Sequence, residues 1–334
     1  MDTKLIMDYI APFSGLYYRS CLFNSLFSVI DSFGLDIMPL LVNDIIRFGT
    51  ISSKQGHLFG MEYISSKDLK QIIRDMGILI TEHDYESDSE LIEGITGSIK
   101  KNSPVVIWVD VFFASIRKDT FQKMHTPHTW IIYGLDEEER VFHIIEQEEL
   151  ENLRYGKKAV SYEELVQAYK GYMSRYRRVL QLPSLYCFSN QQMVRNIYES
   201  HSTEDYKTLF LNHFAHNKAA VYQGLDTLAS FLTDMTKTAM TKEALQKKAD
   251  EYTTIMNQIV NDLKAEKFKW ERLNCKSLVE TQDGILELWN SVRRDIVKFT
   301  LTEKYNAEKF AKLKDWMAKM LELQQHYYEQ VYSE

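Results

Sequence analysis

One cysteine of this 334-residue chain stands where a thiol is readily activated. Cys21 follows Ser20, a residue type that caps helices, and opens residues 21–33, where apolar residues recur at helical spacing up to Gly34. A thiol at a helix start faces unpaired N–H groups and the positive end of the helix dipole, and both favour the thiolate. The same N–H groups could hold an oxyanion during acyl transfer. Most free cysteines are small buried residues, and that interpretation stays open for Cys21.

A histidine and a glutamate farther along could supply a general base and the acid that orients it. His128 begins a predicted strand, and Glu146 ends the next strand, across the charged turn GLDEEER. With the turn centred near Glu137, His128 pairs with Glu146 on one face and His143 lies on the other. Glu146 would then accept the imidazole N–H and set the tautomer. A one-residue slip would break this pairing, and Glu146 could instead begin a solvated acidic loop, residues 146–151.

Five further polar residues are candidate oxyanion or substrate-binding groups: Tyr17, Tyr18, Asn24, Asp110 and His125. A tyrosine or the backbone N–H of Cys21 could donate to an oxyanion, while Asn24 is expected to bond locally. His125 is expected either to hold substrate or to stabilise its loop. His125-x-x-His128 also admits metal binding, but no cysteine pair accompanies it, so we predict no metal site.

The elements that must position these residues lie in the first part of the chain. All five prolines precede residue 184, and of 13 glycines only Gly224 and Gly284 follow residue 190. Because turns need these residues and long helices exclude them, we predict an α+β domain over residues 1–188 and an all-α helical bundle over 189–334. The expected strands of the first domain are 105–113, 128–133, 141–146 and 177–188, and its helices are 21–33, 66–76, 90–101 and one from the capping box at 161–164. The expected helices of the second domain are 191–199, 204–215, 218–238, 242–273, 280–299 and 307–331.

Composition bounds the class of protein. The net charge of −7 argues against a nucleic-acid binder, and 45% hydrophobic with 26% charged residues argues against disorder. No apolar run approaches the roughly 20 residues of a membrane span, and no signal peptide is visible. Three cysteines make no disulfide framework, so we expect a cytoplasmic protein without membrane association. Whether it is a homo-oligomer stays open.

Residues 15–185 resemble the N-terminal domain of the butirosin biosynthesis protein H family, a papain-like fold related to bacteriocin leader peptidases. The motifs that carry the resemblance are Cys21-Leu-Phe-Asn-Ser25, Pro104–Asp110, His125–His128, Gly134–Asp136, Glu146 and the element that begins at Ser161. The chain differs from the family in three respects. Glu146 stands where an aspartate is usual, the stretch before Cys21 lacks the leader peptidases' glutamine, and the glycine-rich segment after the first helix is sparse.

The resemblance implies an acyltransferase of secondary metabolism, such as antibiotic biosynthesis. It would move an aminoacyl or acyl group from the phosphopantetheine thioester of an acyl or peptidyl carrier protein to a small-molecule amine, through an acyl-S-Cys21 intermediate assisted by His128. No bound cofactor is implied. Two alternatives stay open: a papain-like peptidase or amidase with water as acceptor, and a non-catalytic binding or scaffold protein that keeps the fold. Arg175, Arg177 and Arg178 form a basic cluster that could meet an acidic carrier, or be ordinary surface charge.

Overall fold

The computed structural model describes residues 3–53, 56–149, 153–190 and 195–334, and the chain divides into two compact units. The first unit comprises Met1–Ile37 and Leu69–Ser200, and the second comprises Met38–Asp68 and His201–Glu334. Composition predicted one boundary at residue 188. The structure instead assigns residues 38–68 to the second unit and ends the first unit at Ser200.

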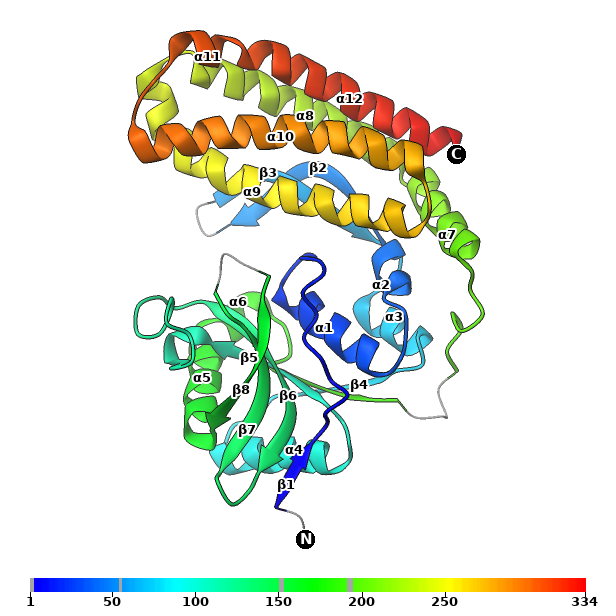
Figure 1. Cartoon of the computed structure of the whole chain (residues 1–334), viewed down its shortest axis with the longest axis vertical. Coiled ribbons are helices and arrows are strands. Elements are labelled where there is room, and N and C mark those ends of the chain that lie inside the picture. The colour runs from blue at the N-terminus through cyan, green and yellow to red at the C-terminus, as the bar shows by residue number, and fades with distance from the viewer. Residues whose placement is uncertain (1–2, 54–55, 150–152, 191–194) are drawn as a thin grey trace. The chain divides into compact units, whose positions relative to one another are not determined.

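The first unit is an antiparallel sheet with helices packed on it (Figure 1). Its strands are β1 (Lys4–Ile6), β4 (Leu79–His83), β5 (Val105–Asp110), β6 (Pro127–Asp136), β7 (Val141–Gln147), β8 (Tyr155–Ser161) and β9 (Leu185–Ser189). Its helices are α1 (Cys21–Ser32), α3 (Leu69–Asp75), α4 (Asp88–Lys100), the 3-10 turn η1 (Val111–Phe113), α5 (Tyr162–Arg175) and α6 (Arg177–Leu180).

The strand order is β4-β9-β5-β6-β7-β8, and β1 pairs with β6 beyond the stretch that pairs with β5. Every pairing within this sheet is antiparallel. A Cβ at Gly134 would lie 2.7 Å from the carbonyl oxygen of Leu5, so the close approach of β1 requires glycine there.

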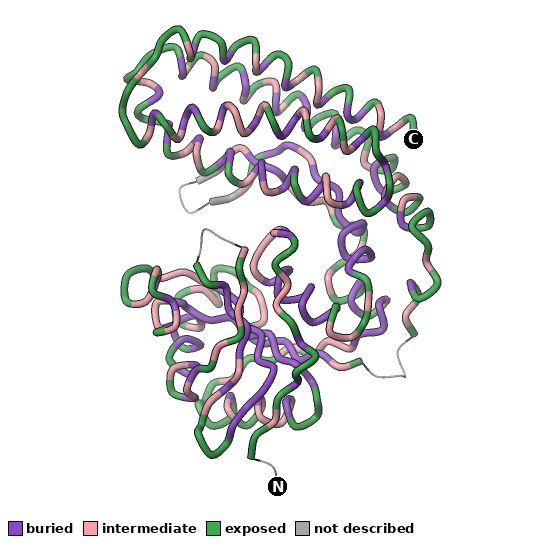
Figure 2. The backbone as a smooth tube through the Cα atoms, in the orientation of Figure 1, coloured by how far each residue is buried: buried purple, intermediate pink, exposed green. Residues whose placement is uncertain are grey.

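The core of the first unit lies around the central strands. Every residue of β5 is buried, and β6 and β7 are buried over most of their length (Figure 2). Dense β-branched and aromatic residues suit strands that are covered on both faces. Helix α1 contacts β5 and β6, whereas α4 and α5 contact each other as well as the sheet. Trp108 of β5 stacks on Tyr172 of α5, which places even-numbered residues of β5 towards α5.

The second unit is a helical bundle with a β-hairpin. Its elements are α2 (Met38–Val42), β2 (Asp44–Ser53), β3 (Gly56–Ser65), α7 (Thr203–His216), α8 (Lys218–Ala239), α9 (Lys242–Arg272), α10 (Lys276–Thr302), α11 (Ala307–Ala311) and α12 (Leu313–Ser333). The hairpin packs on α8 and α9, where Phe59 stacks on Phe231 with ring centroids 3.9 Å apart. The buried ammonium of Lys269 donates to the Asp44 carbonyl at 2.8 Å and to Glu266 at 3.0 Å, which ties α9 to the start of the hairpin.

The α+β class is confirmed, with an antiparallel sheet followed by a helical C-terminal region. The second domain is not all-α, because the hairpin β2–β3 belongs to it. The predicted strand 177–188 is instead the short helix α6 followed by β9. The predicted helix 191–199 begins at four residues, 191–194, outside the described residues, and 195–199 are not helical.

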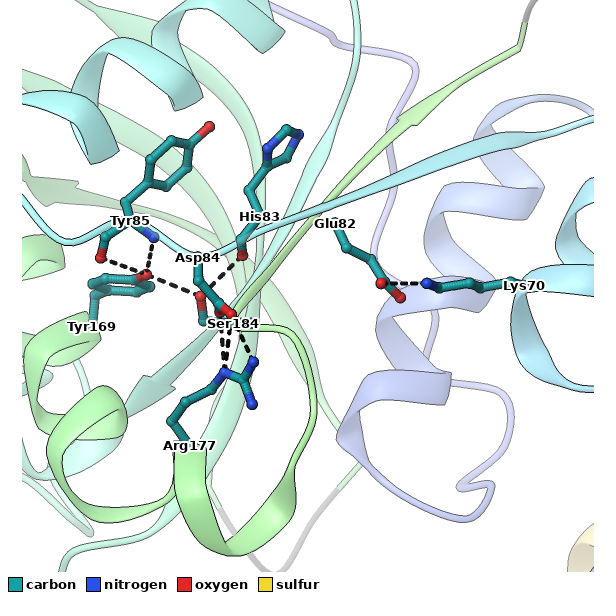
Figure 3. A network of polar contacts seen from close by, with 8 residues as sticks. All are labelled: Lys70, Glu82, His83, Asp84, Tyr85, Tyr169, Arg177 and Ser184. Atoms are coloured by element: carbon teal, nitrogen blue, oxygen red, sulfur yellow. Dashed lines mark hydrogen bonds and ion pairs between the residues drawn. The ribbon is translucent and has the colours of Figure 1, made fainter.

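One polar network ties the end of β4 to the α5–α6 region (Figure 3). The Asp84 carboxylate accepts from the Arg177 guanidinium at 2.6 Å and from the Ser184 backbone N–H at 2.9 Å. The Tyr169 hydroxyl bonds Ser184 and both backbone groups of Tyr85. Partial burial opposes ionisation, but these hydrogen bonds lower the pKa of Asp84 to about 2. The charge of Arg177 is therefore paired with Asp84 inside the first unit, and Arg177 does not add a free charge to the predicted basic cluster.

Asp84→Asn is expected to destabilise the fold by about 1 kcal/mol at pH 7, because about a third of each partner is exposed and water screens the pair. The lowered pKa means that the carboxylate stabilises the fold above pH 4 and loses this contribution as the pH falls through about 2. Urea unfolding at pH 7 and pH 2 measures both effects. Glu163→Gln, which removes the exposed pair with Arg140, is the control and should cost less. A loss for Asp84→Asn that persists undiminished at pH 2 would contradict this account.

Candidate active site

The structure places Cys21 as the first residue of α1. Ser20 occupies the N-cap position with extended dihedral angles, as predicted, but its side chain makes no capping hydrogen bond. Arg19 has a φ of +54°, a left-handed conformation that costs a non-glycine residue about 1 kcal/mol and turns the chain into the helix. The backbone N–H groups of Phe23 and Asn24 donate to the Ser20 carbonyl, which leaves those of Cys21 and Leu22, together with the helix dipole, to act on the half-buried sulfur.

His128 and Glu146 meet across neighbouring strands, although not in the predicted register. Ile132 faces Ile144 and Ile131 faces Ile145, so continuing this register would set Trp130 opposite Glu146. Because the difference from the prediction is two residues, His128 and Glu146 still share a face as diagonal neighbours. The Nε2 atom of His128 lies 3.3 Å from Oε1 of Glu146.

The contact between His128 and Glu146 is a charge–charge interaction. Nε2 of His128 has no partner of hydrogen-bonding geometry within the described residues. His143 faces Gly134 and lies beside the Tyr133 ring, on the other face of β7 from Glu146, as predicted. His128, and not His143, is therefore the histidine that shares a face with Glu146.

Charge separation within the site favours a thiolate and an imidazolium. Burial opposes ionisation of the Cys21 thiol, but the charge of His128 and hydrogen bonds from His128 and Thr129 lower its pKa below the ordinary value. Burial likewise opposes the imidazolium, but the charges of Glu146 and Cys21 and the hydrogen bond with Cys21 raise the pKa of His128 to about 10. Since Nε2 is turned towards Glu146, Nδ1 is the nitrogen left for the sulfur.

The other two cysteines differ from Cys21 in the direction of their pKa shift. Burial raises the pKa of both Cys187 and Cys275 above the ordinary thiol value. All three cysteines are free thiols. An apolar surrounding keeps a thiol protonated and inert, whereas a cationic neighbour activates it. The activated thiol of this chain is therefore Cys21.

Glu146 is fully buried and is not part of a solvated loop. Its Oε1 atom accepts from the Arg117 guanidinium at 2.6 Å, and Arg117 is itself fully buried. Asp119 binds the other side of the guanidinium in two hydrogen bonds, at 2.9 and 2.8 Å. Sequence reasoning missed Arg117, because the charged stretch Arg117-Lys118-Asp119 resembles an exposed loop.

Two of the predicted oxyanion candidates have structural roles instead. Asn24 is buried, its amide nitrogen donates to the Leu16 carbonyl at 2.5 Å, and its oxygen accepts from the Tyr18 backbone N–H at 3.3 Å. The ring of Tyr18 is fully buried and packs against Phe23 and Phe27. Asn24 therefore fixes the segment before Cys21, which agrees with the predicted local hydrogen bonding, and Tyr18 belongs to the core.

Two other tyrosines belong to the neighbourhood of the sulfur. Burial and the nearby charges of Cys21 and Glu146 raise the pKa of Tyr155 far above its ordinary value, and Tyr17 adds to this effect. The Tyr155 phenol therefore remains a hydrogen-bond donor at any physiological pH. Tyr17 stays an oxyanion candidate, and Tyr155 joins it. Nothing in the sequence indicated Tyr155, because β8 itself was not predicted.

Asp110 and His125 form a separate pair. Val109 faces His128 in the β5–β6 register and Asp110 is the next residue, so the Asp110 side chain points to the opposite face, towards Gly171 of α5. Its carboxylate accepts from the backbone N–H groups of Phe112 and Thr126 and contacts Nδ1 of His125 at 2.7 Å. The His125 ring stacks on Phe112. The pair fixes the loop after β5, so the structure does not bring it to Cys21.

The described residues hold neither a metal-ligand cluster nor a membrane-spanning helix. No group of three histidine, cysteine, aspartate or glutamate side chains has the arrangement of a metal site there. No helix within those residues combines the length and the apolar character needed to cross a membrane.

The chain has no match among known protein families or curated proteins. No family model matches it, and a search of the curated proteins finds no similar sequence. The function of this chain is therefore inferred from the geometry of Cys21, His128 and Glu146 and from the motifs of the sequence.

Proposed function

We propose that this protein is a cysteine-dependent acyltransferase with a papain-like first domain. The observation that carries the proposal is the pairing of a thiol at the start of α1 with a buried histidine of β6, which is in turn backed by Glu146 of β7. A helix that activates sulfur and a sheet that holds the base are what nucleophilic catalysis by cysteine requires. An ordinary binding or scaffold protein has no need for a lowered thiol pKa.

The first half of the proposed reaction forms the acyl-enzyme. The Cys21 thiolate attacks the carbonyl carbon of a thioester, and the bond between that carbon and the phosphopantetheine sulfur breaks. The departing thiolate takes the proton of the His128 imidazolium and leaves as a thiol. First-turn N–H groups of α1 and the phenols of Tyr17 and Tyr155 are the candidate donors to the oxyanion. Glu146 keeps the imidazole oriented throughout.

The second half transfers the acyl group. An amine attacks the acyl-S-Cys21 carbonyl, and the now neutral His128 takes one proton from the amine nitrogen. The amide forms, Cys21 leaves as a thiolate, and the thiolate–imidazolium pair is restored. Donor and acceptor follow from the resemblance: a thioester of an acyl or peptidyl carrier protein, and a small-molecule amine in antibiotic or other secondary metabolism. The proposal places the enzyme in the cytoplasm, where its free thiols stay reduced.

A peptidase or amidase shares the first half of this reaction and differs only in the acceptor. Incubating the protein with an acyl-phosphopantetheine thioester, with and without a primary amine, separates the two. We expect amide to be the main product when amine is present. Free acid as the sole product at every amine concentration would establish a hydrolase. No turnover with either acceptor, in a protein that alkylates normally at Cys21, would contradict both activities for this donor.

A further inference from the structure

Charges alternate along a chain of five side chains that ends at the reacting sulfur. Asp119 binds Arg117, Arg117 binds Glu146, Glu146 faces His128, and His128 neighbours Cys21. The three inner members are nearly or fully buried, with side-chain exposures of 0% for Arg117, 0% for Glu146 and 5% for His128. Water therefore screens the inner contacts little, and each charge depends on its neighbours.

Arg117 and His128 share one oxygen of Glu146. Both contact Oε1, at 2.6 Å from Arg117 and 3.3 Å from His128, whereas Oε2 is buried with no hydrogen-bond partner among the described residues. A charge-assisted hydrogen bond from a guanidinium fixes the orientation of the carboxylate that accepts it. Among the described residues, the hydrogen bond that Glu146 accepts comes from Arg117, so the orientation of the carboxylate towards His128 depends on that guanidinium.

The loop that carries Arg117 is held in place independently of the reacting residues. Ser115 donates to Glu164 of α5 through its backbone N–H at 2.7 Å and its hydroxyl at 2.8 Å. Asp119, whose side chain is 27% exposed, accepts hydrogen bonds from the guanidinium on the side away from Glu146. The guanidinium therefore meets Glu146 in a geometry fixed beforehand, which is the arrangement expected of a residue that supports a site.

We propose that Arg117 is a positioning residue for the chemistry at Cys21. It holds the Glu146 carboxylate against His128, and Asp119 fixes Arg117 in turn. The inference rests on the proposed function, since it concerns the same nucleophile. If Arg117 is lost, no hydrogen bond from the guanidinium holds the Glu146 carboxylate in place, and the carboxylate can turn away from His128. The imidazolium then loses its proton at a lower pH, and the thiolate–imidazolium pair exists over a narrower range.

The rate of Cys21 alkylation measures the pH range over which the thiolate–imidazolium pair exists, and it needs no substrate. Iodoacetate is an anion that the imidazolium attracts, whereas iodoacetamide is neutral, so the ratio of the two rates falls when His128 loses its proton. In the wild type we expect the fall near pH 10. In Arg117→Met the ratio of the iodoacetate rate to the iodoacetamide rate at pH 9 should be about tenfold lower than in the wild type. This corresponds to a pKa of His128 that is lower by about two pH units. Peptide mass analysis assigns the modification to Cys21.

Arg117→Lys and Asp119→Asn separate positioning from mere stability. Lysine keeps the charge and should change the ratio at pH 9 less than about threefold, and Asp119→Asn should lie between the two. Circular dichroism confirms that each variant is folded, and if Arg117→Met does not fold, Asp119→Asn decides. An unchanged alkaline fall in folded Arg117→Met and Asp119→Asn would overturn the inference alone. A wild type whose alkylation rises only near pH 8.5 would overturn both this inference and the proposed function.

Discussion

Replacing Cys21 by alanine is expected to abolish acyl transfer, with a loss of at least about a thousandfold in the rate of amide formation. The reason is that no acyl-enzyme can form without the sulfur, and binding alone leaves only a small residual rate. The fold should be retained, because Cys21 is half-buried and alanine suits a helix. The measurement is amide formation from a thioester and an amine, together with a thermal unfolding curve.

Cys187→Ala and Cys275→Ala are the matched controls for this variant. Both cysteines are buried, and burial raises the pKa of each. Each control variant should keep amide formation within about threefold of the wild-type rate, since neither thiol is activated. If folded Cys21→Ala turns over as fast as these controls, the nucleophile has been misassigned.

Replacing His128 by alanine is expected to slow alkylation of Cys21 by iodoacetamide about tenfold to a hundredfold at pH 6. Without the imidazolium the thiol returns towards its ordinary pKa near 8.5, where well under 1% is ionised at pH 6. The direction in which His128 shifts the pKa of Cys21 determines how the difference between variant and wild type changes with pH. His128 lowers the pKa of Cys21, so the variant should fall behind the wild type in acid and catch up as the pH rises towards 10.

His143→Ala is the control for the histidine variant, because His143 lies on the neighbouring strand and points to the other face. Its alkylation profile should match that of the wild type. A His128→Ala profile that runs parallel to the wild type at every pH would contradict the thiolate–imidazolium pair, since only a shift along the pH axis reports a changed pKa.

Local patterns predicted the elements that carry the site. The apolar spacing after Ser20 placed Cys21 at the start of α1, and the β-branched run from Val105 placed β5. These signals depend on neighbours in the sequence, which is why they can be read from it. The register between β6 and β7 was less accessible. The stretch GLDEEER indicated a turn, but the register also depends on the four-residue length of that turn and on an irregularity between Ile132 and Gly134, and neither could be read from the sequence.

Apart from the pair of Cys21 and His128, which the motifs indicated, contacts between distant residues were not predictable. Arg117 belongs to the charged stretch Arg117-Lys118-Asp119, and only the approach of Glu146, 29 residues later, shows that it is buried. The hairpin β2–β3 was missed for the same reason, because it packs on helices more than 150 residues away in the sequence, as Phe59 does on Phe231. Asp110 and His125 stood close to His128 in sequence, but alternation along β5 turned Asp110 to the opposite face.

The most direct test of the account is the intact mass of the protein after exposure to an acyl-phosphopantetheine thioester without an amine. We expect one added acyl group, located by peptide mapping on Cys21 and released on addition of a primary amine as the amide. A protein whose mass stays unchanged, or whose acyl group maps to any residue other than Cys21, would contradict the account.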